Sequence, residues 1–126
     1  MTNELRANIL LVDDEERFVE ILAQRLQARG LNVDVATTGE KAIALTKVKD
    51  FDAVLLDLSM PGMDGIEVLK EMKKTNPVLQ IIILTGQGSI QASVEVMKEG
   101  AMDFIEKPVD INKLLEKITE AKLRRS

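Results

Sequence analysis

The 126-residue sequence contains no cysteine, no histidine, no tyrosine and no tryptophan. Without cysteine, the chain forms no disulfide bond and offers no thiolate to a metal ion. Without histidine, it has no Ser-His-Asp or Cys-His catalytic centre, no ordinary zinc site and no phosphohistidine of its own. The acids and bases left for chemistry are therefore carboxylates, lysines and arginines.

Long hydrophobic runs are also lacking, because no purely apolar run exceeds four residues. Such runs are too short to span a membrane, and the first residues lack the apolar centre of a signal peptide. Seventeen basic and 21 acidic residues give a net charge of −4, which argues against a general nucleic-acid surface. We expect one soluble, cytoplasmic domain over residues 1–126 that binds neither membrane nor nucleic acid.

Five short strand-like segments alternate with longer stretches of helical spacing. The five segments are residues 9–12, 33–36, 53–56, 81–84 and 103–106. The first, third and fourth are apolar throughout, which is typical of strands buried on both faces, whereas the second alternates and is predicted at a sheet edge. Strand and helix alternating five times predict an α/β fold, with a doubly wound parallel sheet between helices.

Capping and stop residues mark the helix boundaries. The predicted N-caps of the second to fifth helices are Thr37 or Thr38, Asp64, Ser89 and Asp110. Gly30 and Gly100 are predicted to end the first and fourth helices, and Pro77 lies beyond the third. The basic segment 119–126 is either the end of the fifth helix or the start of a linker.

Polar residues follow four of the five strands. Asp13 and Asp14 follow the first strand, Asp57 ends the third, Thr85 ends the fourth, and Lys107 follows the fifth. In doubly wound sheets, ligands bind beyond the carboxyl ends of the strands. We therefore expect three acids, a hydroxyl group and a lysine to meet at one edge of the sheet.

Three neighbouring carboxylates repel one another, and a like-charge pair at ~4 Å costs about 4 kcal/mol at an effective dielectric constant of 20. A divalent cation removes this repulsion, and an all-oxygen site favours Mg²⁺ or Mn²⁺. A carboxylate such as Asp57 is also a nucleophile that can form an acyl phosphate. Lys107 and Thr85 could then neutralise and hold the oxygens of a phosphoryl group.

The same residues carry a resemblance to a known family. Asp13-Asp14, Asp57 with the following segment 60–65, Thr85-Gly86 and Lys107-Pro108 together resemble the receiver domain of two-component response regulators. The resemblance covers a core of about 8–118, and implies a flavodoxin-like (β/α)5 fold with sheet order 2-1-3-4-5. Segments 85–88 and 101–108 resemble the receivers of nitrogen-regulation-type transcription activators.

The resemblance implies that Asp57 accepts a phosphoryl group from the phosphohistidine of a sensor histidine kinase or a phosphotransfer protein. It implies Asp14 and Asp57 as direct ligands of Mg²⁺, Asp13 as a ligand through water, and the Ser59 main-chain carbonyl as a further ligand. Such a domain is not an enzyme in the ordinary sense, because it catalyses only its own phosphorylation and dephosphorylation.

Thr85 and Lys107 would bind the phosphoryl oxygens, and the Lys107-Pro108 peptide bond would be cis, a geometry that proline permits. The family's conformational switch links Thr85 to an aromatic residue on the fifth strand, here Phe104. The face made by the fourth helix, the fifth strand and the fifth helix would then change shape and could mediate a phosphorylation-dependent homodimer. A plain core role for Phe104 is the alternative.

Three other functions compete with this interpretation. A flavin-binding domain usually has aromatic residues around the flavin, and this chain has only three phenylalanines. A dehalogenase-type phosphohydrolase needs an aspartate two residues after its nucleophile, where Ser59 stands. A degenerate receiver used only for docking would lack an acid, the threonine or the lysine. Gly86-Gln87-Gly88 lacks the third glycine of a dinucleotide loop, and Gln87 either orients a hydrolytic water or is a solvated loop residue.

Overall fold

The computed structural model describes residues 6–60, 64–86 and 90–125. Strands and helices alternate along the chain in the following order: β1 Asn8–Val12, α1 Glu16–Gln27, β2 Asn32–Ala36, α2 Gly39–Val48, β3 Ala53–Asp57, α3 Gly65–Thr75, β4 Ile81–Thr85, α4 Ile90–Lys98, β5 Asp103–Glu106 and α5 Ile111–Arg125. This order confirms the predicted α/β fold and the five predicted strands.

The five strands form one parallel sheet in the order β2-β1-β3-β4-β5. The order agrees with the one implied by the family resemblance, and β2 lies at an edge as its alternating sequence predicts. The continuous apolar strands β1, β3 and β4 occupy the interior of the sheet. β3 therefore lies at the centre with all five of its residues buried, and its last residue is Asp57.

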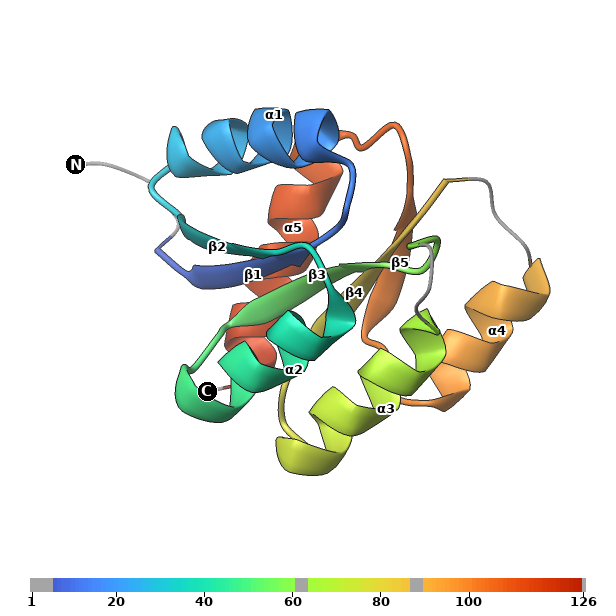
Figure 1. The fold of residues 1–126 in the computed structure, drawn as a ribbon. Helices are drawn as coiled ribbons and strands as arrows, with labels where there is room; N and C mark the ends of the chain where they lie inside the picture. Colours follow the sequence, from blue (N-terminus) through green and yellow to red (C-terminus); the bar gives the residue numbers. More distant parts are fainter. Residues whose placement is uncertain (1–5, 61–63, 87–89, 126) are drawn as a thin grey trace.

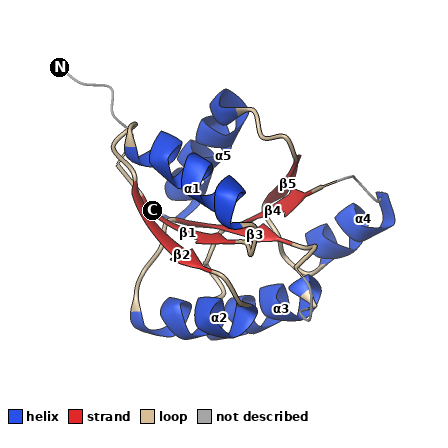
Figure 2. Ribbon diagram, turned by 45° about the horizontal axis from the view of Figure 1, so that its top comes forward, coloured by secondary structure: helices blue, strands red, loops and turns tan. Residues whose placement is uncertain are grey.

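Helices cover both faces of the sheet. α1 and α5 lie on one face, and α2, α3 and α4 lie on the other (Figures 1 and 2). Alternate residues of each interior strand point to opposite faces, so Ile9 and Leu11 join the core beneath α1 and α5, while Leu10 and Val12 join the second core. Burial on both faces explains why the central positions of these strands are all apolar.

Side chains fix the starts of three helices as predicted. Thr38 accepts a hydrogen bond from the Lys41 amide, Asp64 accepts from the amides of Ile66 and Glu67, and Asp110 accepts from the amide of Asn112. Each bond satisfies an amide that the helix itself leaves without a partner. The remaining predicted cap, Ser89, lies outside the described residues, as does Gln87.

Glycines mark the ends of α1 and α4. Gly30 and Gly100 have φ angles of 89° and 102°, a region that residues with a Cβ rarely adopt. Gly30 lies three residues beyond the end of α1, and Gly100 lies two beyond the end of α4. Both glycines therefore occur where the chain must leave the helix and turn towards the next strand.

At the amino ends of the strands, α5 packs against the loop before β3. The Arg125 guanidinium is ion-paired with Asp50 and with Asp52, the latter at 2.8 Å. Asp52 also accepts a hydrogen bond of 2.8 Å from the Asn8 amide. Residues 119–125 are thus helical and attached to the sheet. Over the described part of the chain, no helix is sufficiently long and apolar to cross a membrane.

Candidate functional site: an acidic pocket at the carboxyl edge of the sheet

The carboxyl ends of β1, β3, β4 and β5 bring the predicted site residues to one edge of the sheet. Asp13 follows β1, and its amide donates to the Ala36 carbonyl at 3.1 Å, so it continues the sheet beyond the strand. Asp57 and Thr85 are the last residues of β3 and β4. The Lys107 amide donates to the Thr85 carbonyl at 2.7 Å, which fixes Lys107 beside β4.

Three acids form a cluster at this edge. Carboxylate oxygens of Asp13, Asp14 and Asp57 all lie within 4.8 Å of one another. Asp13 and Asp57 are buried, with 0% and 2% of their surface exposed, whereas Asp14 is exposed. The structure thus brings together the three predicted acids, two of them away from solvent.

One oxygen of each buried carboxylate is fixed by a backbone amide. Asp13 Oδ1 accepts from the Glu15 amide and Asp57 Oδ1 accepts from the Ser59 amide, both at 3.0 Å. Such a bond two residues along is the local turn that aspartate favours. The other oxygen, Oδ2, of each residue faces Lys107: that of Asp13 accepts a hydrogen bond from Nζ at 2.8 Å, and that of Asp57 lies 3.6 Å from Nζ.

The buried position of Asp57 changes its acidity. Desolvation raises the pKa of Asp57 above its ordinary value, and the neighbouring charge of Asp13 raises it further. The amide of Ser59 and the ammonium of Lys107 act in the opposite direction, because both favour the charged carboxylate. Without a further cation, the pocket therefore disfavours two full negative charges, which is the electrostatic condition that a divalent cation relieves.

Lys107 is the basic group of the pocket. Its Nζ lies 2.8 Å from Asp13 Oδ2, 3.4 Å from Glu15 Oε1 and 3.6 Å from Asp57 Oδ2. Burial alone lowers the pKa of Lys107, but the hydrogen bond and charge of Asp13 and the charges of the other acids outweigh it, so the pKa is raised. The lysine is therefore held as an ammonium group within reach of Asp57.

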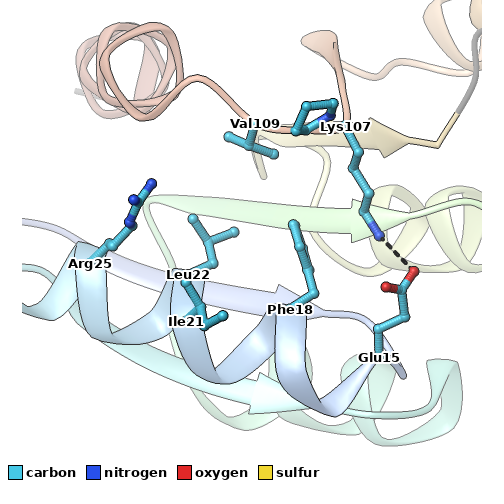
Figure 3. Close-up of a pocket in the computed structure, with 8 residues that line it drawn as sticks. Glu15, Phe18, Ile21, Leu22, Arg25, Lys107 and Val109 are labelled. Carbon is cyan, nitrogen blue, oxygen red and sulfur yellow. Dashed lines mark hydrogen bonds and ion pairs between the residues drawn. The ribbon is translucent and has the colours of Figure 1, made fainter.

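Two further residues contact Lys107 without having been predicted as part of the site. Glu15 forms the second of the ion pairs, and the Phe18 ring lies with its centroid 4.2 Å from Nζ (Figure 3). The sequence places Glu15 after the first strand and Phe18 among the apolar positions of the first helix. These contacts form because the start of α1 lies close to the β5–α5 loop in the folded chain. No local sequence pattern indicates that proximity.

Thr85 contributes an unsatisfied hydroxyl group. The residue is 5% exposed, and its Oγ1 is a buried side-chain polar atom with no hydrogen-bond partner among the described residues. A buried hydroxyl without a partner costs roughly 1–3 kcal/mol, so native proteins usually provide one. The group therefore marks a position where a bound oxygen would be stabilised.

Phe104 lies on β5, at the other side of β4 from the acids. It pairs in register with Ile83, and 37% of its surface is exposed. Among the described residues, it belongs to neither hydrophobic core. The ring therefore lies outside the core in this structure, together with Val94 and Met97 of α4, which are 48% and 42% exposed.

The donor set fits a hard divalent cation. Three carboxylates lie close enough to share one ion, and oxygen ligands are the type that Mg²⁺ and Mn²⁺ prefer. The pocket also meets the second need of such a site, because the Lys107 ammonium and the Thr85 hydroxyl lie at the ends of neighbouring strands and suit a phosphoryl group.

Comparison with protein families and curated relatives gives a consistent result. Residues 9–119 match the response regulator receiver domain. The chain is 41% identical over 116 residues to the transcriptional regulatory protein ZraR of Salmonella typhimurium, covering 92% of this chain and 26% of that protein. It is 37% identical over 116 residues to a putative NtrX-like response regulator of Rickettsia conorii, covering 90% and 24%. The chain thus spans about a quarter of the length of these relatives.

Solved structures show the same likeness. The response regulator receiver domain protein (CheY-like) of Methanospirillum hungatei superimposes with a TM-score of 0.89 at 33% identity, over 96% of this chain and 97% of that chain. NtrX of Brucella abortus in complex with ADP gives a TM-score of 0.87 at 31% identity, over 96% and 27%. The predicted similarity to nitrogen-regulation-type activators is confirmed by ZraR and NtrX, which belong to that group. With the acidic pocket, the fold and these matches in agreement, the chain belongs to the response regulator receiver domain family.

Proposed function

We propose that this domain accepts a phosphoryl group on Asp57 from the phosphohistidine of a sensor histidine kinase or a phosphotransfer protein. The observation that carries the proposal is the surroundings of Asp57 Oδ2. This oxygen is buried, is free of the backbone turn that fixes Oδ1, and lies 3.6 Å from the Lys107 ammonium. Asp13 and Asp14 complete an all-oxygen site beside it.

In the transfer step, Asp57 Oδ2 attacks the phosphorus of the phosphohistidine. The new O–P bond forms as the P–N bond breaks, and the imidazole leaves with the bonding electron pair and takes up a proton. The aspartyl phosphate is lost later, when water attacks phosphorus and restores the carboxylate. The domain thereby catalyses only its own phosphorylation and dephosphorylation, as expected of a signalling domain.

The residues that would hold Mg²⁺ or Mn²⁺ are Asp13, Asp14, Asp57 and the main-chain carbonyl of Ser59. The bound ion would neutralise the carboxylates and the charge that develops on the phosphoryl oxygens. Asp13 and Asp57 each keep Oδ1 on a backbone amide and present Oδ2 to the pocket, so the ligands are oriented before an ion binds.

The two remaining groups bind the phosphoryl oxygens. Lys107 moves its ammonium from Asp13 to the phosphoryl group, which carries more negative charge and lies on the neighbouring acid. The Thr85 hydroxyl, for which the described residues provide no partner, donates to a second oxygen. Phosphorylation thereby adds an acceptor for this hydroxyl, and this difference favours a switch.

The signal then passes to the face formed by α4, β5 and α5. Thr85 begins the connection to α4 and pairs in register with Glu106 of β5, so its movement acts on both elements. The exposed apolar side chains of Val94, Met97 and Phe104 on this face suit a homodimer or docking contact that phosphorylation promotes. We place this domain in the cytoplasm.

Mass spectrometry tests the proposal. With phosphoramidate and Mg²⁺, the protein should gain one phosphoryl group, and it should gain none in excess chelator or as the Asp57→Asn variant. Asp34→Asn is the matched control, because Asp34 pairs with Lys49 outside the pocket and its loss should leave the mass gain unchanged. A phosphoryl group that persists in Asp57→Asn, or that forms equally well in chelator, contradicts the assignment.

A further inference from the structure

We propose that Phe18 is a positioning residue for Lys107, and that its ring face keeps the lysine ammonium in the pocket as it moves from Asp13 to the phosphoryl group. The inference rests on the proposed phosphoryl transfer for its functional consequence. Phe18 lies in the first helix, its side chain has no polar atom, and most of the chain separates it from Lys107 in sequence.

The first observation is the set of contacts around the ammonium. Carboxylates of Asp13, Glu15 and Asp57 lie 2.8 to 3.6 Å from Nζ, and the Phe18 ring centroid lies at 4.2 Å. This separation is within the range in which the negative face of an aromatic ring attracts a cation. The side chain of Lys107 is only 13% exposed, so little water competes for the contact.

The second observation is the space on the other side of the ring. A groove of about 500 Å³ runs between α1 and the β5–α5 loop, lined by Ile21, Leu22 and Val109 as well as by Phe18 and Lys107. In Figure 3, the Phe18 ring stands between the Lys107 ammonium and the apolar side chains of this groove. The ring therefore lies between the ammonium and the apolar part of the groove, on the side opposite to the acids of the pocket.

The third consideration is the kind of contact that a moving ammonium needs. A carboxylate holds the ammonium at one oxygen, and Asp13 competes directly with a phosphoryl group on Asp57 for the same donors. An aromatic face has no single acceptor atom, so the ammonium keeps this contact while it turns its three donors from one oxygen to another. Phe18 thus stabilises the Lys107 ammonium within the pocket, and it does not specifically stabilise the ion pair between Lys107 and Asp13.

A simple packing role is the alternative, because Phe18 also packs against the core beneath α1 and α5. Two substitutions separate the roles. Phe18→Leu keeps an apolar side chain in the groove and removes the ring, whereas Phe18→Tyr keeps the ring. Ile21→Ala is the matched control, since it removes apolar surface from the same groove at a residue that is 50% exposed and that lies away from the ammonium in Figure 3.

The primary measurement is the rate of phosphorylation by phosphoramidate in Mg²⁺. Phe18→Leu should lower the rate constant about fivefold, the size expected of one cation–π contact in a partly desolvated site. Phe18→Tyr and Ile21→Ala should remain close to the parent. An unchanged rate in Phe18→Leu, or an equal loss in Ile21→Ala, overturns the inference.

A spectroscopic readout tests the contact without phosphorylation. Protons above an aromatic face resonate upfield, so the Cε protons of Lys107 should move downfield in Phe18→Leu and stay upfield in Phe18→Tyr and Ile21→Ala. The signal is assigned by its absence from the spectrum of a Lys107→Arg variant. An unmoved signal in Phe18→Leu contradicts the inference. If the parent protein itself takes up no phosphoryl group, the proposed function fails, and this spectrum still decides the role of Phe18.

Discussion

At the scale of single residues, the pocket is governed by which group neutralises Asp13 and Asp57. In the resting structure this group is Lys107, whose ammonium lies 2.8 Å from Asp13 Oδ2 and 3.6 Å from Asp57 Oδ2. A divalent cation and the lysine are alternative partners of the same carboxylates. The metal ion and the lysine ammonium repel each other while they share these carboxylates. A phosphoryl group, with its own negative charge, gives the lysine a separate partner.

This competition predicts the behaviour of Lys107→Ala. The variant should bind Mg²⁺ as tightly as the parent or slightly more tightly, because a positive charge next to the site has been removed. It should lose the conformational response to phosphorylation, because the phosphoryl group has lost its ammonium partner. Magnesium titration and amide spectra with and without phosphoramidate measure the two effects.

Lys49→Ala provides the comparison for this experiment. Lys49 pairs with Asp34 at 2.8 Å, outside both the pocket and the α4-β5-α5 face, so its removal should change neither magnesium binding nor the response. Weaker magnesium binding in Lys107→Ala together with a normal response would show that the lysine supports the metal site instead of the phosphoryl group.

At the scale of the elements, the positions of the pocket residues depend on where helices and loops end. α4 ends at Lys98, and Gly100 then reverses the chain towards β5 with a φ angle of 102°. A Cβ at Gly100 would lie 3.2 Å from Lys73 Cε. Lys73 is held in place by hydrogen bonds of 2.8 and 3.0 Å to the carbonyls of Pro77 and Leu79, so it cannot move freely away.

We therefore expect Gly100→Ala to lower the free energy of unfolding by about 1–2 kcal/mol, from backbone strain and close contact together. Gly86→Ala is the matched control, because no heavy atom of the described residues lies within 4 Å of its Cβ position. Urea denaturation at neutral pH measures both variants. Equal stabilities of the two variants would show that the turn after α4 relaxes without cost.

The strands and helix caps could be predicted from local sequence patterns, whereas the order of the strands in the sheet could not. The strands were predictable because burial on both faces leaves a continuous apolar run, and edge placement leaves alternation, as in β2. The caps Thr38, Asp64 and Asp110 were predictable because capping is local. The sheet order came from the family resemblance, since local patterns do not specify which strands are neighbours.

In the candidate site, the placement of several residues could be predicted from the sequence, but the contacts between them could not. The strand-end rule was sufficient to place Asp13, Asp57 and Lys107 at one edge. It did not reveal that Lys107 pairs with Asp13 and Glu15, because that contact depends on how the fifth strand lies across β3 and β4 from the first. Phe18 was missed for a related reason: a phenylalanine at a helical apolar position has the same sequence pattern whether it faces the core or a cation.

At the scale of the whole molecule, the proposed switch links the pocket to the α4-β5-α5 face. Two arrangements of the Phe104 ring, one exposed and one packed inward, would form a discrete two-state element. A difference of roughly 3 kcal/mol in stabilisation changes the ratio of two states by more than a hundredfold. One new hydrogen bond at Thr85, together with the exchange of the Lys107–Asp13 bond for one to the more highly charged phosphoryl group, contributes to such a difference.

Beryllofluoride, which binds a carboxylate with Mg²⁺ in the position of a phosphoryl group, should therefore shift amide resonances in α4 and at Phe104. The same additions to Asp57→Asn should produce no such shifts and serve as the control. Changes confined to Asp13, Asp14 and Asp57 would show that the pocket binds the phosphoryl mimic without altering the distant face.

The ion pair between Lys107 and Asp13 has a consequence for how the protein is made. Its two residues are 94 positions apart, because Asp13 follows the first strand in the sequence and Lys107 follows the last. A growing chain emerges from the ribosome N-terminus first, so Asp13 and Asp57 are synthesised well before Lys107, their cationic partner. Until β5 is in place, a divalent cation is the group that can offset the repulsion between the acids at the edge where β1 and β3 pair. The lysine thus joins the pocket only with the last strand of the sheet, and a chain interrupted before β5 carries Asp57 without the ammonium partner of its phosphoryl group.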